Sequence, residues 1–313
     1  MSLILGQLRQ HTVEFIAGTG IVFDGVRTDA SSTSGSWTWH TPDGCLSGYV
    51  DGCGGGGGGG GGSSSTTEAA GGGGGGSAMS VTNFPIYWAK SAILTISLGA
   101  AGTGGAVATA GTSGGDTTIT GLLSNTMLAL PFAGAAGEFR IAGGIRGFYA
   151  STTSSSGGGG GGAANGQISY SLANGTTAQT NGATALNGNH SNEYVQGLFG
   201  GTIYALSGAG GGNATTSVTT AGGNGGGYVA GFIASSGIIP TVQSGGQNGT
   251  ASWGGGGLGG ASLFGMPGVG ATGLGVAPAN ATGFGAGGTG GNGQAAGSNG
   301  SIGYLKITYW SAV

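Results

Sequence analysis

Hydrophobic and polar residues alternate in several short stretches near the two ends of the chain. Residues 302–310 give the clearest pattern, because Leu305, Ile307 and Tyr309 fall on one face of an extended chain and Tyr304, Lys306 and Thr308 on the other. The two tryptophans of residues 36–40 share a face in the same way. We expect further short strands at residues 46–50, after a Pro-Asp-Gly turn, and at 92–98, 117–123 and 126–132.

Helical patterns are missing from the sequence. No window of about eleven residues repeats apolar positions at intervals of three and four without a glycine interruption. The sequence therefore predicts an all-β fold with almost no α-helix, in which short strands frame a packed glycine-rich core.

Three runs of uninterrupted glycine occupy residues 54–62, 71–76 and 157–162. Such runs are typical of flexible linkers, since glycine loses much backbone freedom on folding and has no side chain to bury. An ordered run must instead pair its N–H and C=O groups with neighbouring backbone. We expect the glycine runs here to be ordered parts of the fold that pair with neighbouring backbone.

The C-terminal glycine-rich stretch has a period of three residues. Taking every third position from Gly270 to Gly303 gives eight glycines out of twelve, and the two other rows hold fewer. Three residues per turn is the period of a polyproline-II-type helix, which makes no internal hydrogen bonds. Collagen is excluded because the repeat breaks and the chain has only six prolines. The pattern predicts a bundle of polyglycine-II helices.

Composition narrows the function further. Of 313 residues, 84 are glycine, and the charged residues are limited to six Lys and Arg and nine Asp and Glu. This composition argues against a helix-rich enzyme, and the scattered cations argue against nucleic-acid binding. No apolar stretch is long enough to span a bilayer, so we expect no membrane insertion.

The two cysteines, Cys45 and Cys53, lie eight positions apart in a segment expected to be extended. That spacing corresponds to roughly 26 Å, too far for a disulfide across a straight strand. We expect small buried or reduced thiols; a disulfide across a bend is the alternative.

Catalytic chemistry has few residues to draw on. Glu138 and Glu193 are one conceivable pair of glycosidase carboxylates, but any two carboxylates could be paired in this way. His190 lies three positions before Glu193, and a solvated loop is the simpler interpretation of that segment. Phosphate-binding and calcium-binding motifs and metal-ligand clusters are missing. The sequence predicts a protein that is not an enzyme and has no cofactor.

Residues 138–253 look like an insertion of loops and short strands that is rich in Asn, Thr and Ser. Aromatic residues among such polar neighbours are typical of binding loops, although they also fill gaps in a core. Our receptor-binding candidates are Tyr149, Tyr194, Phe199, Tyr204 and Trp253.

Several motifs together carry a resemblance to a known family. They are SGSWTWHTP at residues 34–42, GCG and the glycine run from residue 52, LTISLG at 94–99, GGDTTI at 114–119, GGTGGNG at 287–293 and GSIGYLKITY at 300–309. This sequence resembles the glycine-rich domain of bacteriophage tail fibre and receptor-binding proteins, and more loosely the polyglycine-II adhesins of fibre tips. The resemblance covers about residues 35–306. The long central insertion and the segment at 1–30 depart from it.

The resemblance implies a virion protein of the distal tail that meets the host surface, often as a homotrimer. We divide the chain into an attachment or trimerisation segment (1–30), a glycine-rich β part (31–137), the insertion with binding loops (138–253) and a closing glycine-rich part (254–313). The first segment is expected to join a tail or baseplate protein, and its deletion to leave folded protein. The expected function is a non-enzymatic adhesin for a bacterial surface glycan or outer-membrane protein; a purely structural tail or fibre-shaft component is the alternative.

Overall fold

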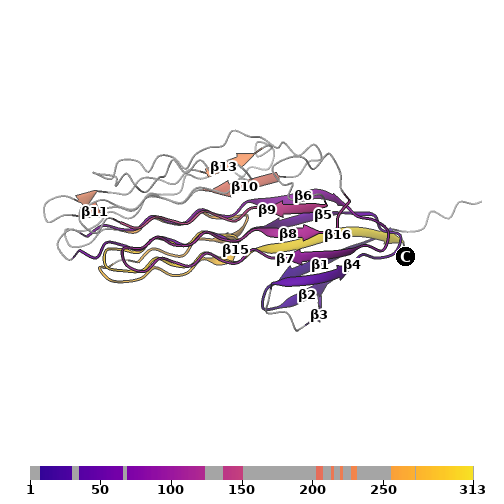
Figure 1. Ribbon diagram of the computed structural model, residues 1–313, viewed down its shortest axis with the longest axis horizontal. Helices are drawn as coiled ribbons and strands as arrows, with labels where there is room; N and C mark the ends of the chain where they lie inside the picture. The colour runs from indigo at the N-terminus through magenta and orange to yellow at the C-terminus, as the bar shows by residue number, and fades with distance from the viewer. Residues whose placement is uncertain are drawn as a thin grey trace, which may run out of the picture.

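The computed structural model describes residues 8–29, 35–65, 69–123, 137–150, 255–271 and 273–312, together with four short strands between residues 202 and 230. The described part is all-β, with antiparallel strand pairs and no helix. The molecule is elongated: most of the strands lie toward one end, and long extended segments run side by side away from them (Figure 1). The all-β prediction is confirmed for this part of the chain.

The larger sheet has eight antiparallel strands that bring the two ends of the chain together. Their order is β13 (Gly227–Ala230), β10 (Thr202–Leu206), β6 (Ser80–Tyr87), β5 (Ser47–Cys53), β16 (Tyr304–Ala312), β1 (Leu8–Ile16), β2 (Gly20–Phe23) and β3 (Val26–Asp29).

A second sheet of four strands is ordered β4 (Ser36–His40), β7 (Ile93–Ser97), β8 (Thr117–Thr120) and β9 (Glu138–Ile141). Two small hairpin-like pairs complete the described strands: β11 (Asn213–Ala214) with β12 (Thr219–Thr220), and β14 (Phe264–Met266) with β15 (Thr282–Phe284).

A hydrophobic core joins the two main sheets. Phe15 of β1 contacts Trp37 of β4 with ring centroids 5.8 Å apart, and Phe84 of β6 stacks on Phe139 of β9 at 4.9 Å. Leu305 and the other apolar residues predicted on one face of residues 302–310 are buried in this core, together with Leu94 and Ile96 of β7. The alternation of the sequence thus identified the inner faces of β4, β7 and β16. The strand expected at residues 126–132 lies outside the described residues.

The N-terminal segment is built into the larger sheet. Strand β1 pairs with β16 over eight residue positions, and Val13 and Phe15 are fully buried. The structure argues against the expectation that residues 1–29 can be removed without loss of folding, because removal would take β1 out of the sheet and uncover the core. A role for the segment in attachment stays a prediction.

The boundary predicted at residue 138 also differs from the structure. Strand β9 begins at Glu138 and completes the four-stranded sheet, with Phe139 and Ile141 fully buried. Residues 138–150 thus belong to the glycine-rich β part. Further along the chain, β10 and β13 extend the larger sheet beyond β6.

The first glycine run lies at the centre of the bundle of extended segments. The N–H groups of residues 54–63 donate in rotation to three segments, residues 70–79, 109–115 and 295–301, at N···O distances of 2.8–3.2 Å. Each segment accepts a hydrogen bond from every third N–H of the run, and the residue numbers of the acceptors fall as the run proceeds. These three neighbours are therefore antiparallel to the central segment.

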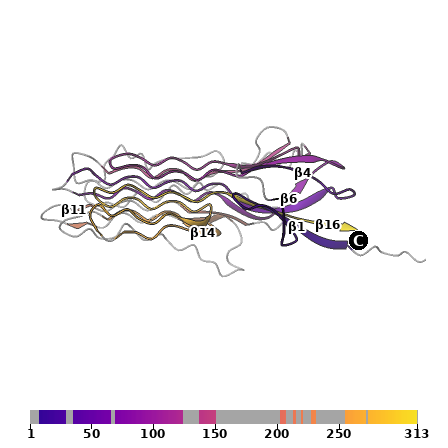
Figure 2. The ribbon, with the colours of Figure 1, turned by 90° about the horizontal axis from the view of Figure 1, so that it is seen from below.

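The carbonyl groups of the central segment follow the same rotation. They accept N–H groups from residues 102–108, 144–150 and 288–294 at distances of 2.7–3.0 Å, and here the partner numbers rise, so the neighbours are parallel. The six neighbours also bond to one another in a closed ring. The glycine segments appear in Figure 2 as wavy lines that run side by side.

This enclosure explains the unbroken glycine. A Cβ added at any position from 54 to 62 would lie far inside van der Waals contact with a backbone carbonyl group. A neighbour on the ring needs glycine where it faces another segment: Gly99, Gly102 and Gly105 have no room for a Cβ, whereas Ala100, Thr103 and Ala106 are exposed. The number of glycine rows in a segment therefore follows the number of sides on which it is covered.

The three-residue row read from the C-terminal sequence has a direct counterpart from residue 285 onward. Gly288, Gly291 and Gln294 donate to the central segment, and Gly297, Gly300 and Gly303 donate to residues 99–105. The same hydrogen-bonding row does not continue back through residues 270–284, and the last three of these residues form β15, which pairs with β14.

Both cysteines are free and buried, as the simpler interpretation expected. Burial raises the pKa of the Cys53 thiol to about 12, so the reactive thiolate is scarce at neutral pH. We expect neither cysteine to react with a thiol-directed reagent at about pH 8 until the protein is unfolded. Mass spectrometry after alkylation, with and without denaturant, checks this; rapid labelling of the native protein would contradict it.

Candidate functional site

The glycine segments reverse direction in tight turns at the end farthest from the four-stranded sheet, and we call this end the tip (Figure 1). At one turn the Thr109 N–H donates to the Ala106 carbonyl, and at another the Ala295 N–H donates to the Asn292 carbonyl. Ala108 and Gln294 have positive φ angles of 57° and 62°, which reverse the chain in these turns.

Side chains hold further loops onto the tip. The Asn292 amide donates to the carbonyl groups of Ala271 and Gly273, at 2.7 and 3.1 Å. The Ser63 hydroxyl accepts the Ala70 N–H at 2.9 Å. These bonds fix the positions of the loops, so the apolar side chains that the tip exposes, Val107, Leu274 and Val276, have a rigid support.

One long side of the bundle, formed by residues 109–116 and 142–150, carries larger polar and aromatic side chains. We call it the flank. Gly144 and Gly147 face inward, and Arg146 and Tyr149, three residues apart, point outward. The Arg146 guanidinium lies 5.7 Å from the centroid of the Phe148 ring. The neighbouring segment exposes Thr109, Thr112 and Ser113.

The receptor-binding candidates can be placed only in part. Tyr149 is 45% exposed on the flank, near the tip. Tyr204 is in β10, where its backbone pairs with Ser80 and with Val229. Tyr194, Phe199 and Trp253 lie outside the described residues.

Arg146 was missed by sequence reasoning, which looked for aromatic residues among polar ones. Its spacing gave a signal: Arg146 and Tyr149 each fall two residues after a glycine, Gly144 and Gly147, of a three-residue row. The bonds Gly111 N–H to Gly147 C=O and Gly114 N–H to Gly144 C=O place this row beside residues 109–116.

Two of the described carboxylates form ion pairs with neighbouring strands or segments. Asp51 pairs with Lys306 at 2.7 Å, and Asp116 pairs with Arg140 at 2.9 Å while accepting the Gly143 N–H at 2.8 Å. The described ranges contain no group of three or more metal-ligating side chains. His190 and Glu193 lie outside them.

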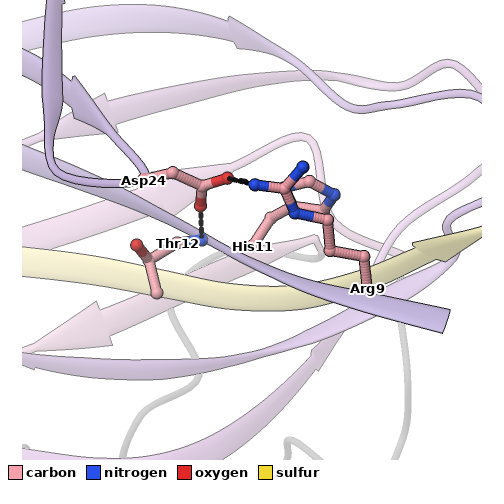
Figure 3. Close-up of polar contacts among 4 residues, drawn as sticks. All are labelled: Arg9, His11, Thr12 and Asp24. Carbon is pink, nitrogen blue, oxygen red and sulfur yellow. Dashed lines mark hydrogen bonds and ion pairs between the residues drawn. The ribbon is translucent and has the colours of Figure 1, made fainter. Parts of the chain in front are cut away.

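Asp24 fastens the β2–β3 turn to β1 (Figure 3). One carboxylate oxygen accepts the Thr12 N–H at 2.7 Å, and the other lies 2.8 Å from His11 Nδ1 and 3.9 Å from Arg9. The His11 ring stacks between Phe23 and Tyr309. The Thr12 N–H first, and then the His11 ring, lower the pKa of Asp24 below its ordinary value.

This lowered pKa predicts a pH-dependent stability. The Asp24 contribution is complete above the pKa of an unfolded aspartate, about 3.9, and is lost as pH falls through the lower pKa of the folded state. We expect Asp24→Asn to be less stable than the parent near neutral pH, and the difference to shrink below about pH 4. Urea unfolding over this pH range measures it. A difference that stays constant with pH would contradict the ion-pair and hydrogen-bond explanation.

Comparison with known protein families and with curated proteins found no match. In the part of the chain that the structure describes, no helix has the length and apolar character needed to cross a membrane.

Proposed function

We propose that this protein is a non-enzymatic adhesin of a bacteriophage tail, in which a bundle of polyglycine-II helices holds binding loops away from the particle. The period-three hydrogen bonding around residues 54–63 carries this proposal. In a polyglycine-II arrangement each helix has three residues per turn and bonds only to its neighbours, as the rotation of partners requires.

A rigid support suits a receptor-binding role. Loops that bind other molecules work best when a stable scaffold positions them. The bundle supplies such a scaffold, because its backbone groups are satisfied between segments and it depends little on side chains. Its tip exposes Val107, Leu274 and Val276, and its flank exposes Tyr149.

The opposite end has the character expected of an attachment surface. Tyr49 and Trp310, on the adjacent strands β5 and β16, are both partly exposed and pack edge to face at 5.7 Å. Leu8, at the start of β1, is 69% exposed, and Tyr87, at the end of β6, is also exposed. Exposed apolar groups gathered at one end favour contact with another protein. The proposal assigns this end to a tail or baseplate protein, and a homotrimer stays a prediction.

The test is binding of the purified, fluorescently labelled chain to a panel of intact bacterial strains. The adhesin proposal predicts saturable binding to some strains and reduced binding after Tyr149→Ala, with unchanged thermal unfolding. Leu8→Ala at the opposite end is the control and should leave binding unchanged. Absence of saturable binding to every strain would favour the structural fibre-shaft alternative.

A further inference from the structure

We propose that the flank binds an acidic polysaccharide along its length, with Arg146 contacting a carboxylate or phosphate group and Tyr149 packing against a sugar ring. The inference rests on the proposed adhesin function and names the chemical class of its receptor.

The flank presents its side chains as a ladder. Residues at intervals of three lie one above another along an extended segment with three residues per turn, about 9 Å apart at the polyproline-II rise. On one segment the ladder contains Arg146 and Tyr149; on its antiparallel neighbour it contains Ser113. The Arg146 N–H lies 3.3 Å from the Ser113 hydroxyl oxygen, which fixes the register of the two segments. A regular ladder of this kind suits a ligand that is itself a repeating polymer.

Charge on the flank selects an anionic ligand. Arg9, Arg140 and Lys306 each pair with a carboxylate. Arg146 is exposed, and within the described residues it has no carboxylate partner. The one carboxylate that belongs to the flank, Asp116, is neutralised by Arg140 near the sheets. The guanidinium lies beside the Phe148 ring, and its planar fork of N–H groups can make a two-point contact with an acid group.

The remaining groups favour a sugar over other anions. Tyr149 offers an aromatic face for an apolar sugar surface. The hydroxyl groups of Thr109, Thr112 and Ser113 are exposed; they already bond to the Ala106 carbonyl, to Thr103 and to the Arg146 N–H, and each keeps at least one further hydrogen-bonding position. Nucleic acid fits poorly, because its affinity comes from several cations along the phosphate backbone and the flank has a single unpaired one.

The experiment uses the full chain and affinity electrophoresis in gels that contain one polysaccharide each. Polygalacturonate, hyaluronate and polysialic acid are the acidic probes, and dextran is the neutral one. We expect retardation by at least one acidic polymer and none by dextran. Arg146→Gln should weaken the retained interaction about tenfold or more, as loss of a charge-assisted hydrogen bond does, and Tyr149→Ala should weaken it as well. Lys90→Gln, which removes another exposed cation, should change it less than about twofold.

Three outcomes would overturn the inference: no retardation by any acidic polymer, equal retardation by dextran, or full binding by Arg146→Gln. The adhesin proposal would survive each of them if the same preparation still binds bacterial cells, so the two proposals fail separately. Circular dichroism of each variant checks that the sheets are intact.

Discussion

Replacing Gly59 with alanine should abolish or severely destabilise the folded protein. Gly59 lies in the middle of the central segment, where an added Cβ would penetrate the Thr289 carbonyl group. The backbone cannot move aside, because the Gly59 N–H donates to Ser298 and its carbonyl accepts the Gly105 N–H. Overpacking a core costs about 1–3 kcal/mol, and each displaced buried hydrogen bond adds about 1–3 kcal/mol. Urea unfolding or the yield of soluble protein measures the loss.

Gly273→Ala is the matched control. Gly273 lies in a loop at the tip, and an added Cβ there would meet only a Val276 methyl group at 3.2 Å. Its φ angle is not in the left-handed region, so alanine fits the backbone. We expect a change within about 1 kcal/mol, since alanine also restricts the unfolded chain. Equal stability of both variants would show that the central segment is not enclosed.

Deleting residues 1–29 should prevent folding of the rest of the chain. The deletion removes β1 to β3, exposes one edge of β16 and takes Val13 and Phe15 out of the core. Phe15→Ala alone should cost about 3–5 kcal/mol, as buried phenylalanine truncations do. Leu8→Ala, at an exposed position of the same strand, should cost less than about 0.5 kcal/mol. Thermal unfolding of the two point variants and the solubility of the deletion provide the measurements. A soluble deletion variant with the parent unfolding temperature would contradict the sheet order.

The sequence was informative where a local pattern has only one physical solution. Alternation in residues 36–40 and 302–310 predicted strands whose apolar faces are buried in the core. Glycine at every third residue marks the covered side of a segment, so the rows from residue 285 onward could be recognised without coordinates.

Long-range neighbours could not be predicted in this way. Pairing of β1 with β16 joins residues about 300 positions apart, and no local pattern in residues 8–16 specifies that partner. The partner of β9 was not predictable either, because the alternation of Phe139 and Ile141 does not specify pairing with β8. Arg146 became a candidate only when the register of its segment showed it exposed and without a carboxylate partner in the described part of the chain.

Amide hydrogen exchange of residues 54–62 tests the central claim most directly. If the N–H groups of this run are bonded to three surrounding segments, they should be among the slowest to exchange in the protein, with protection close to that of β16. Peptide-resolved mass spectrometry in deuterated buffer makes this comparison within one sample. Exchange of the nine-glycine run at the rate of an unstructured chain, while β16 remains protected, would contradict the enclosed bundle.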